Sequence, residues 1–334
     1  MTWLARRLHW LIIAAVLALL VPFGKARAES GTPAGWDVET ASAEVIVGRV
    51  VLRYDPSLEA EALSMAQQIP GWWSELERGM AGDLEDNLTI TYVAHAGRIA
   101  EATGMPRWAA GVAHSSTGEI MVAEHAPDGT LTDLDNLVRH EMAHVALYRA
   151  TGGAPLPRWF HEGVAESFAD RIDILRVQSL AAAVFGVGVP HLDALEASFR
   201  GDPQEVTVAY AAARDLVNHL RYRDGDGADL RQLLGQVRMG RSFDGAVLSA
   251  YGATLEELEA EWRGGLSGRF SWFPMVSSGG MPFFVLAPLF GIAFFRRRRQ
   301  IRDGWARLER EDARLFGHAL AMAPVGARPA TCRC

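Results

Sequence analysis

Two histidines and a glutamate stand in the pattern H-E-x-x-H, as His140, Glu141 and His144. On an α-helix, side chains four residues apart lie one turn apart on the same face, so both imidazoles can reach one metal ion. Glu141 is turned by about 100° from His140 and can take a proton from a bound water without being a ligand. The pattern predicts a hydrolytic metal centre; the alternative is an ordinary helix with half-buried histidines and a solvent-facing glutamate.

The segment around this motif has the features of a helix. Apolar residues recur at three- and four-residue steps from Leu134 to Ala146, which indicates a buried stripe. Thr132 is a candidate N-cap, Asp135 lies three residues later where a carboxylate can reach back, and Gly152 can end the helix. We therefore expect one helix to carry both histidines.

A further ligand candidate, Glu162, follows on a second helical segment that begins near Pro157. A catalytic zinc site requires three protein ligands and one open position, and Glu162 can face back toward the histidines. Glu166 lies one turn later and can accept a hydrogen bond that orients a ligand histidine. His161 points about 100° away from Glu162, so we expect it beside a ligand or at the surface. Four further histidines have no partner spacing and are expected to be structural: His114, His125, His191 and His219.

The two motifs together resemble a known family. H-E-x-x-H at 140–144 and W-F-x-E-G-x-A-E at 159–166 are similar to the gluzincin metallopeptidases, above all the peptidase MA-like branch related to thermolysin and the M1 aminopeptidases. The resemblance implies Zn²⁺ held by both histidines and Glu162, with Glu141 as general base. The gap before Glu162 is one residue shorter than in the M1 aminopeptidases, and their G-x-M-E-N motif has no counterpart, which argues against an exopeptidase.

Two more expectations rest on this resemblance. In the family, a tyrosine that follows the E-G-x-A-E segment can reach the metal site, which indicates Tyr210 here. Its phenol would donate to the developing oxyanion; the alternative is a half-buried tyrosine with its hydroxyl at the surface. In the family, an extended substrate pairs with an exposed edge strand, a role that residues 111–114 or 119–122 would take.

The implied function is a zinc metallopeptidase, an endopeptidase acting on a peptide or protein substrate. Glu141 would take a proton from a zinc-activated water and pass it to the leaving amine. One alternative is a membrane-tethered protein that keeps the zincin fold for binding, scaffolding or sensing without chemistry. It is less favoured, because a fold kept for binding need not keep a general base. A metal-dependent hydrolase of another bond is also open.

The charge of the chain is unevenly distributed. Its 334 residues, 49% of them apolar, suffice for one substantial domain with smaller elements, and the formal net charge is −7. Residues 29–295 carry 19 basic and 36 acidic residues, a net of −17. Such an acidic section would repel a phosphate backbone, which excludes nucleic acid as a partner. The only cysteines are Cys332 and Cys334, to which we assign no role.

Both ends of the chain predict contact with a membrane. Residues 1–28 have a basic start, an apolar run and A-R-A before Glu29, which is typical of a cleaved signal peptide; an uncleaved anchor is the alternative. Residues 270–295 carry no charge and can span a bilayer, followed by Arg296–Arg299. The positive-inside rule then places a basic tail, 296–334, in the cytoplasm and residues 29–269 on the extracytoplasmic side of the cell membrane.

Between these ends we predict a flexible leader over 29–44 and one gluzincin-like domain over 45–268. The fold class is α+β and zincin-like, with a small mixed sheet and the H-E-x-x-H helix in an N-terminal lobe and an all-helical C-terminal lobe. The predicted strands are 45–54, 88–93, 111–114 and 119–122, and the predicted flanking helices are 58–80 and 98–103. Pro70 is expected to kink or split the first of these helices. Helices are also predicted at 172–185, 191–199, 208–221, 230–237, 242–251 and 255–266.

Overall fold

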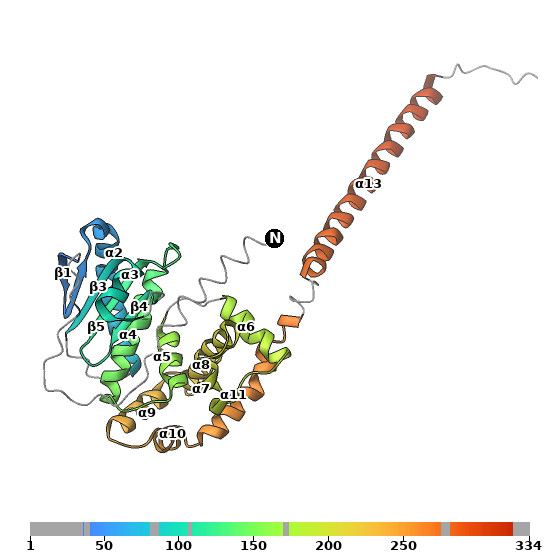
Figure 1. Ribbon diagram of the computed structural model, residues 1–334. Coiled ribbons are helices and arrows are strands. Elements are labelled where there is room, and N and C mark those ends of the chain that lie inside the picture. The colour runs from blue at the N-terminus through green and yellow to red at the C-terminus, as the bar shows by residue number, and fades with distance from the viewer. Residues whose placement is uncertain are drawn as a thin grey trace, which may run out of the picture. The chain divides into compact units, whose positions relative to one another are not determined.

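The computed structural model describes Trp36 and residues 41–80, 87–105, 109–169, 174–274 and 281–322. The chain divides into two units, Met1–Phe270 and Ser271–Cys334, which are described separately. In the first unit a five-stranded sheet precedes a group of helices (Figure 1), which is the mixed α+β fold expected from the sequence. The predicted signal peptide and most of the predicted leader lie outside the described residues.

The sheet has the strand order β1-β2-β3-β5-β4 and is mixed. Its strands are β1 Ala43–Val47, β2 Val50–Tyr54, β3 Leu88–His95, β4 Gly111–His114 and β5 Glu119–His125. β3 is parallel to both of its neighbours, whereas β1 and β4 pair antiparallel with β2 and β5. Because β5 lies inside the sheet, only β4 of the two segments proposed to receive an extended substrate is an edge strand.

The apolar run at 45–54, predicted as one strand, is a hairpin of β1 and β2. Val47 pairs with Val50, and Gly48 between them has a φ of 62°. This left-handed conformation is accessible to glycine without steric cost, so the chain can reverse there. The prediction was wrong because the same apolar pattern continues on both sides of the turn. It also placed Ala43 and Glu44 of β1 in the leader.

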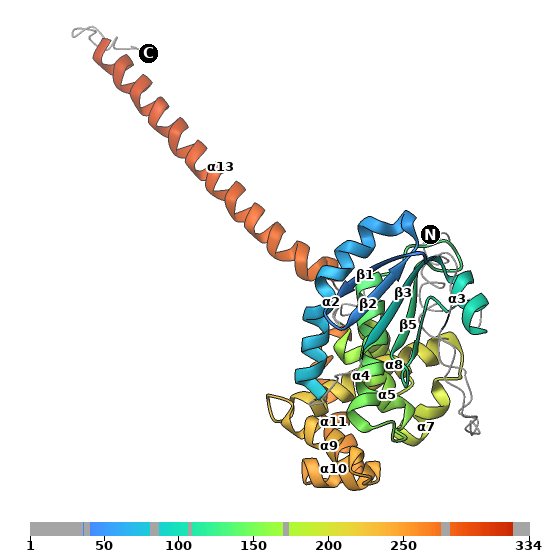
Figure 2. The same ribbon diagram turned by 90° about the vertical axis from the view of Figure 1, so that its left-hand side faces the viewer.

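Helices cover both faces of the sheet (Figure 2). α2, Glu59–Met80, and α4, Leu134–Thr151, contact each other and the sheet. α3, Ala96–Thr103, packs on the opposite face over a buried cluster of Val93, Ala96, Ile99, Val112, Met121 and Ala123. α2 follows a 3-10 turn, Pro56–Leu58, and is a single helix with Pro70 inside it, so the predicted split does not occur.

The C-terminal lobe is all helical, as predicted. Its helices are α5 Arg158–Phe168, α6 Ile174–Phe185, α7 Leu192–Ser198, α8 Pro203–Tyr222, α9 Ala228–Arg238, α10 Phe243–Tyr251 and α11 Leu255–Arg269. α8 is central and contacts α5, α6, α7, α9 and α11. It begins before the predicted 208, because Asp202 and Glu205 form a capping box and Pro203 is compatible with the first helical turn.

The second unit contains α13, Met281–Met322. Among the described residues, no helix combines the length and the apolar character needed to cross a membrane, so the span predicted at 270–295 is not confirmed. Residues 275–280 of that span lie outside the described residues. Phe270, its first residue, is instead a buried residue at the end of α11 in the first unit.

The close contact between α5 and α8 depends on Gly163. A Cβ at this position would lie 2.5 Å from the carbonyl oxygen of Ala213 and 2.6 Å from Val217 Cγ2. We expect Gly163→Ala to lower the free energy of unfolding by about 1–3 kcal/mol, because backbone atoms must move apart. Gly235, inside α9, is a matched control: a Cβ there meets nothing within 4 Å. Gly235→Ala should raise stability by about 0.5–1 kcal/mol.

Denaturant titration of the full chain, followed by circular dichroism, measures both changes. Equal stability of the Gly163→Ala variant and the unaltered protein would show that the approach of α5 and α8 does not depend on this glycine.

Candidate metal centre

The H-E-x-x-H helix is α4, and its histidines lie together as its geometry requires. The ring centroids of His140 and His144 are 4.6 Å apart, and their Nε2 atoms are 3.1 Å apart. α4 begins at Leu134 with Asp133 as N-cap and ends at Gly152 in the left-handed conformation. Thr132, the predicted N-cap, instead donates its hydroxyl to the carbonyl oxygens of Ala123 and Glu124 at the end of β5.

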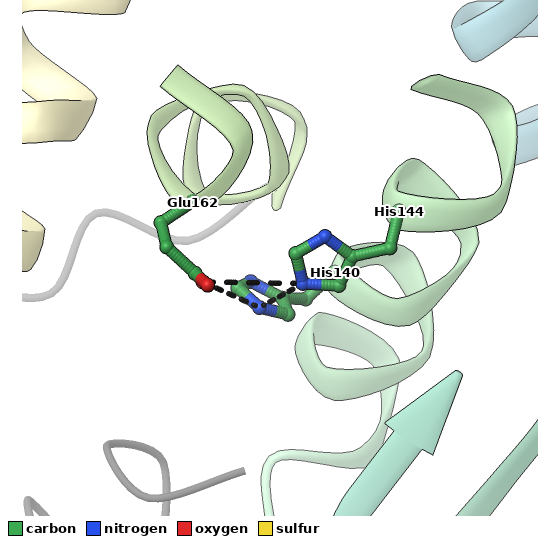
Figure 3. Close-up of side chains that lie close together, drawn as sticks. All are labelled: His140, His144 and Glu162. Atoms are coloured by element: carbon green, nitrogen blue, oxygen red, sulfur yellow. Dashed lines mark hydrogen bonds and ion pairs between the residues drawn. The ribbon is translucent and has the colours of Figure 1, made fainter. Parts of the chain in front are cut away.

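Glu162 reaches these histidines from α5 (Figure 3). Its Oε2 atom lies 4.0 Å from the Nε2 atom of each histidine, and it is fully buried. One ligand atom from each residue falls within 4.8 Å of the others, and this is the group of possible metal ligands found among the described residues. The structure therefore brings together His140, His144 and Glu162 as expected.

The chemistry of this cluster fits a metal ion. Burial raises the pKa of Glu162 to about 8 and lowers the pKa values of His140 and His144, because each charged form is disfavoured in the interior. Both carboxylate oxygens of Glu162 lack a hydrogen-bond partner in the described part of the chain. Buried polar atoms without partners are costly. A divalent cation would accept two neutral imidazoles and one carboxylate, which relieves that cost.

Glu141 lies on a different side of α4, against the edge strand. It is buried, and a Cβ on Gly111 of β4 would come within 2.9 Å of its Oε1 atom. Burial raises its pKa to about 8. A carboxylate with a pKa in this range can accept and return a proton near neutral pH, which is the property of a general base. The absence of a side chain at Gly111 leaves the space that Glu141 occupies.

Glu166 lies beside His140, as expected. Its Oε1 atom is 3.4 Å from His140 Nδ1, and Arg176 of α6 forms a close ion pair with its other oxygen. Burial alone would raise the pKa of Glu166, but Arg176 and His140 outweigh it, so the pKa lies below its usual value. An ionised Glu166 favours the His140 tautomer that carries its proton on Nδ1 and leaves Nε2 for a metal.

Tyr210 of α8 is in the same buried region. Its side chain is buried and its hydroxyl has no hydrogen-bond partner in the described part of the chain, so the surface alternative is wrong. Burial, followed by Glu162, raises its pKa well above 10, which keeps the phenol protonated as a donor. The ring packs edge-on against Phe199 at 5.1 Å and under Arg176 at 5.3 Å.

His161 is also part of the site, where it stacks on His144 with ring centroids 4.6 Å apart. Burial lowers its pKa to about 4, so it is neutral. Of the two expected places, beside a candidate ligand or at the surface, His161 takes the first. The four histidines that were expected to be structural lie elsewhere: His114 contacts Ser116 and Thr117, His125 contacts Glu124, His191 contacts Glu259, and His219 contacts Glu261.

Sequence reasoning missed two arginines of the site, Arg158 and Arg176. Arg158 lies four residues before Glu162 on α5, and its Nε atom is 3.9 Å from Glu162 Oε1. That spacing is the helical ion-pair spacing, so the sequence carried a usable signal for it. Arg176 belongs to α6, and no sequence spacing connects it with Glu166. Only the packing of α6 on α8 places it there.

A mixed sheet with an edge strand beside an H-E-x-x-H helix, facing a helix that supplies a glutamate, defines a zincin-type domain. Comparison with protein families agrees: the model of the Peptidase MA superfamily matches residues 76–268, and the chain belongs to that superfamily. Membership makes it a candidate metal-dependent peptidase. No curated protein matches the chain.

The contacts of α5 predict graded losses of metal. Glu162→Ala should lose most of any bound divalent metal, because only two protein ligands remain. Glu166→Gln should weaken metal binding by about 10–100-fold, since it leaves His140 less firmly oriented. Metal analysis of the purified full chain, with a competing chelator to obtain affinities, measures both. Unchanged metal content in the Glu162→Ala variant would show that Glu162 is not a ligand.

Proposed function

We propose that this protein is a zinc-dependent endopeptidase. The observation that carries the proposal is the convergence of His140 Nε2, His144 Nε2 and Glu162 Oε2 in the protein interior. Glu141, also buried, belongs to α4, the helix that carries both histidines. A structural zinc site is closed by four protein ligands, whereas three ligands leave a position for water and substrate. A buried glutamate next to such a site is the group that hydrolysis needs as a base.

Each residue then has a defined role in peptide hydrolysis. Zinc, when bound, supplies a Lewis acid that lowers the pKa of a water molecule and polarises the peptide carbonyl. Glu141 accepts a proton from the attacking water and returns it to the leaving amine. Tyr210 donates its phenolic hydrogen to the developing oxyanion, and Glu166 holds His140 in its ligating orientation.

The edge strand β4 supports an extended peptide as substrate. β4 has one neighbour, β5, in the sheet of the described residues. Its Gly111 lies next to the carboxylate of Glu141, since a Cβ on Gly111 would be 2.9 Å from Glu141 Oε1. A peptide that adds to β4 by main-chain hydrogen bonds would pass this base with its carbonyls at regular spacing. Binding through the main chain does not require a free terminus, which favours an endopeptidase.

The mechanism predicts that one variant, Glu141→Gln, keeps metal binding but loses turnover. Glu141→Gln should keep zinc and lower kcat/KM by at least about 100-fold, because the proton acceptor is lost. His140→Ala should lose both zinc and turnover. Glu59→Gln, an exposed glutamate at the start of α2, is the matched control and should change neither. Zinc content and cleavage of a fluorogenic peptide library provide the two measurements.

If the Glu141→Gln variant cleaved peptides at the unaltered rate, Glu141 would not be the base. Stable zinc binding without cleavage of any library member would favour the alternative, a zincin fold that is used for binding.

We also propose that the protein is anchored in the cell membrane with residues 29–269 on the extracytoplasmic side. α13 supports this, because five large apolar side chains on it are more than half exposed and precede Arg296–Arg299: Leu289, Phe290, Ile292, Phe294 and Phe295. Arginines that follow an apolar segment favour the cytoplasmic side. The full chain should remain in membranes after alkaline carbonate extraction, whereas a chain ending at 269 should not. Equal extraction of both would contradict anchoring by this segment.

A further inference from the structure

Arg158 lies beside the candidate metal ligands, and two of its buried nitrogen donors make no hydrogen bond among the described residues. It is the first residue of α5, and its side chain is 17% exposed. Its Nε and Nη2 atoms are buried, and neither has a hydrogen-bond acceptor in the described part of the chain. Leaving a buried charged donor unpaired costs stability, so such atoms in a native protein require an explanation.

The two donors of Arg158 lie on one edge of its planar guanidinium group. Nε–H and one N–H of Nη2 point from that edge in parallel, and together they match the two oxygens of a carboxylate. A single carbonyl oxygen cannot fill both positions equally well. The ring of Phe199 lies 5.0 Å from the central carbon of the guanidinium, which restricts the orientation of this edge.

Glu162 does not satisfy these donors. Its Oε1 atom is 3.9 Å from Nε, beyond hydrogen-bond distance, and neither of its oxygens has a hydrogen-bond partner in the described residues. The neighbouring pair behaves differently, since Arg176 and Glu166 are in close contact. A dication held by Glu162 and the two histidines would offset the repulsion between Glu162 and a second carboxylate at Arg158.

We propose that Arg158 is a specificity-determining residue that binds a carboxylate of the substrate close to the scissile bond. This inference rests on the proposed function, because it places the scissile carbonyl at the metal centre. Arg158 contacts a ligand residue and an extended residue spans about 3.5 Å, so the carboxylate lies within about two residues of that bond. It is either the side chain of an aspartate or glutamate, or the C-terminal carboxylate of a peptide. In the second case cleavage would lie near that terminus, and the endopeptidase part of the proposed function would be wrong.

Peptide binding to the zinc-loaded full chain carrying Glu141→Gln tests this without hydrolysis. One pair of probes is a peptide with a free C-terminal carboxylate and its C-terminal amide. A second series is amidated and carries one glutamate, or glutamine in its place, at successive positions. Calorimetry gives the dissociation constants, and metal analysis gives the zinc content of every variant. The two series distinguish the two sources of the carboxylate.

We expect the carboxylate form of at least one pair to bind about tenfold or more tightly than its neutral counterpart. Adding Arg158→Gln should abolish this preference, and adding Arg158→Lys should reduce it, because lysine keeps the charge but not the paired donors. Adding Arg200→Gln, an exposed arginine just after α7, should leave it unchanged.

Equal binding of both forms in every pair, or a preference that survives Arg158→Gln, would overturn the inference. So would loss of zinc in the Arg158→Gln variant to the extent seen for Glu162→Ala, since Arg158 would then serve the ligand. Failure of the proposed function is separate. If the unaltered protein cleaves none of the peptides but the Arg158-dependent preference persists, the peptidase proposal fails, and Arg158 remains a carboxylate-binding residue with no scissile bond beside it.

Discussion

The placement of one short helix, α5, determines whether the site exists at all. Glu162 must face α4, so that its carboxylate lies 4.0 Å from both histidines, while the adjacent Gly163 must face α8. Any side chain at 163 would push the backbone of α8 away. α8 contacts most of the C-terminal helices. The position of the Glu162 carboxylate therefore depends on how the whole C-terminal lobe is packed.

This constraint explains why the polar groups of the site can be buried in an otherwise apolar interior. Burying a carboxylate is costly unless a charge or hydrogen bonds compensate it. In the α5 segment, Glu166 is compensated by Arg176 and His140, whereas Glu162 has no hydrogen-bond partner in the described residues. Burial raises the pKa of Glu162 and lowers that of His144, so the cluster disfavours its own charges and favours a cation that is shared among the three.

Local geometry explains which features were predictable from the sequence. The spacing of His140 and His144 fixes their contact once the segment is helical, and the β-branched residues of L-T-I-T-Y-V identify β3. The hairpin at Gly48 was missed because apolar periodicity does not report a turn inside a continuous apolar run. Thr132 has the side chain of an N-cap, but it donates to carbonyls at the end of β5, a tertiary contact that sequence position does not encode.

The side chains that orient His140 and His144 come from helices that meet only in the folded protein. These contacts hold the two histidines in different ways. His140 has Glu166 at its Nδ1, and Glu166 is held by Arg176 from another helix. His144 Nδ1 has no hydrogen-bond partner in the described residues, and His144 is oriented by stacking on His161 instead. Stacking restricts the plane of a ring but does not select its tautomer, whereas a carboxylate selects the tautomer as well. His140 is therefore held in both ring orientation and tautomer, whereas His144 is held in ring orientation alone.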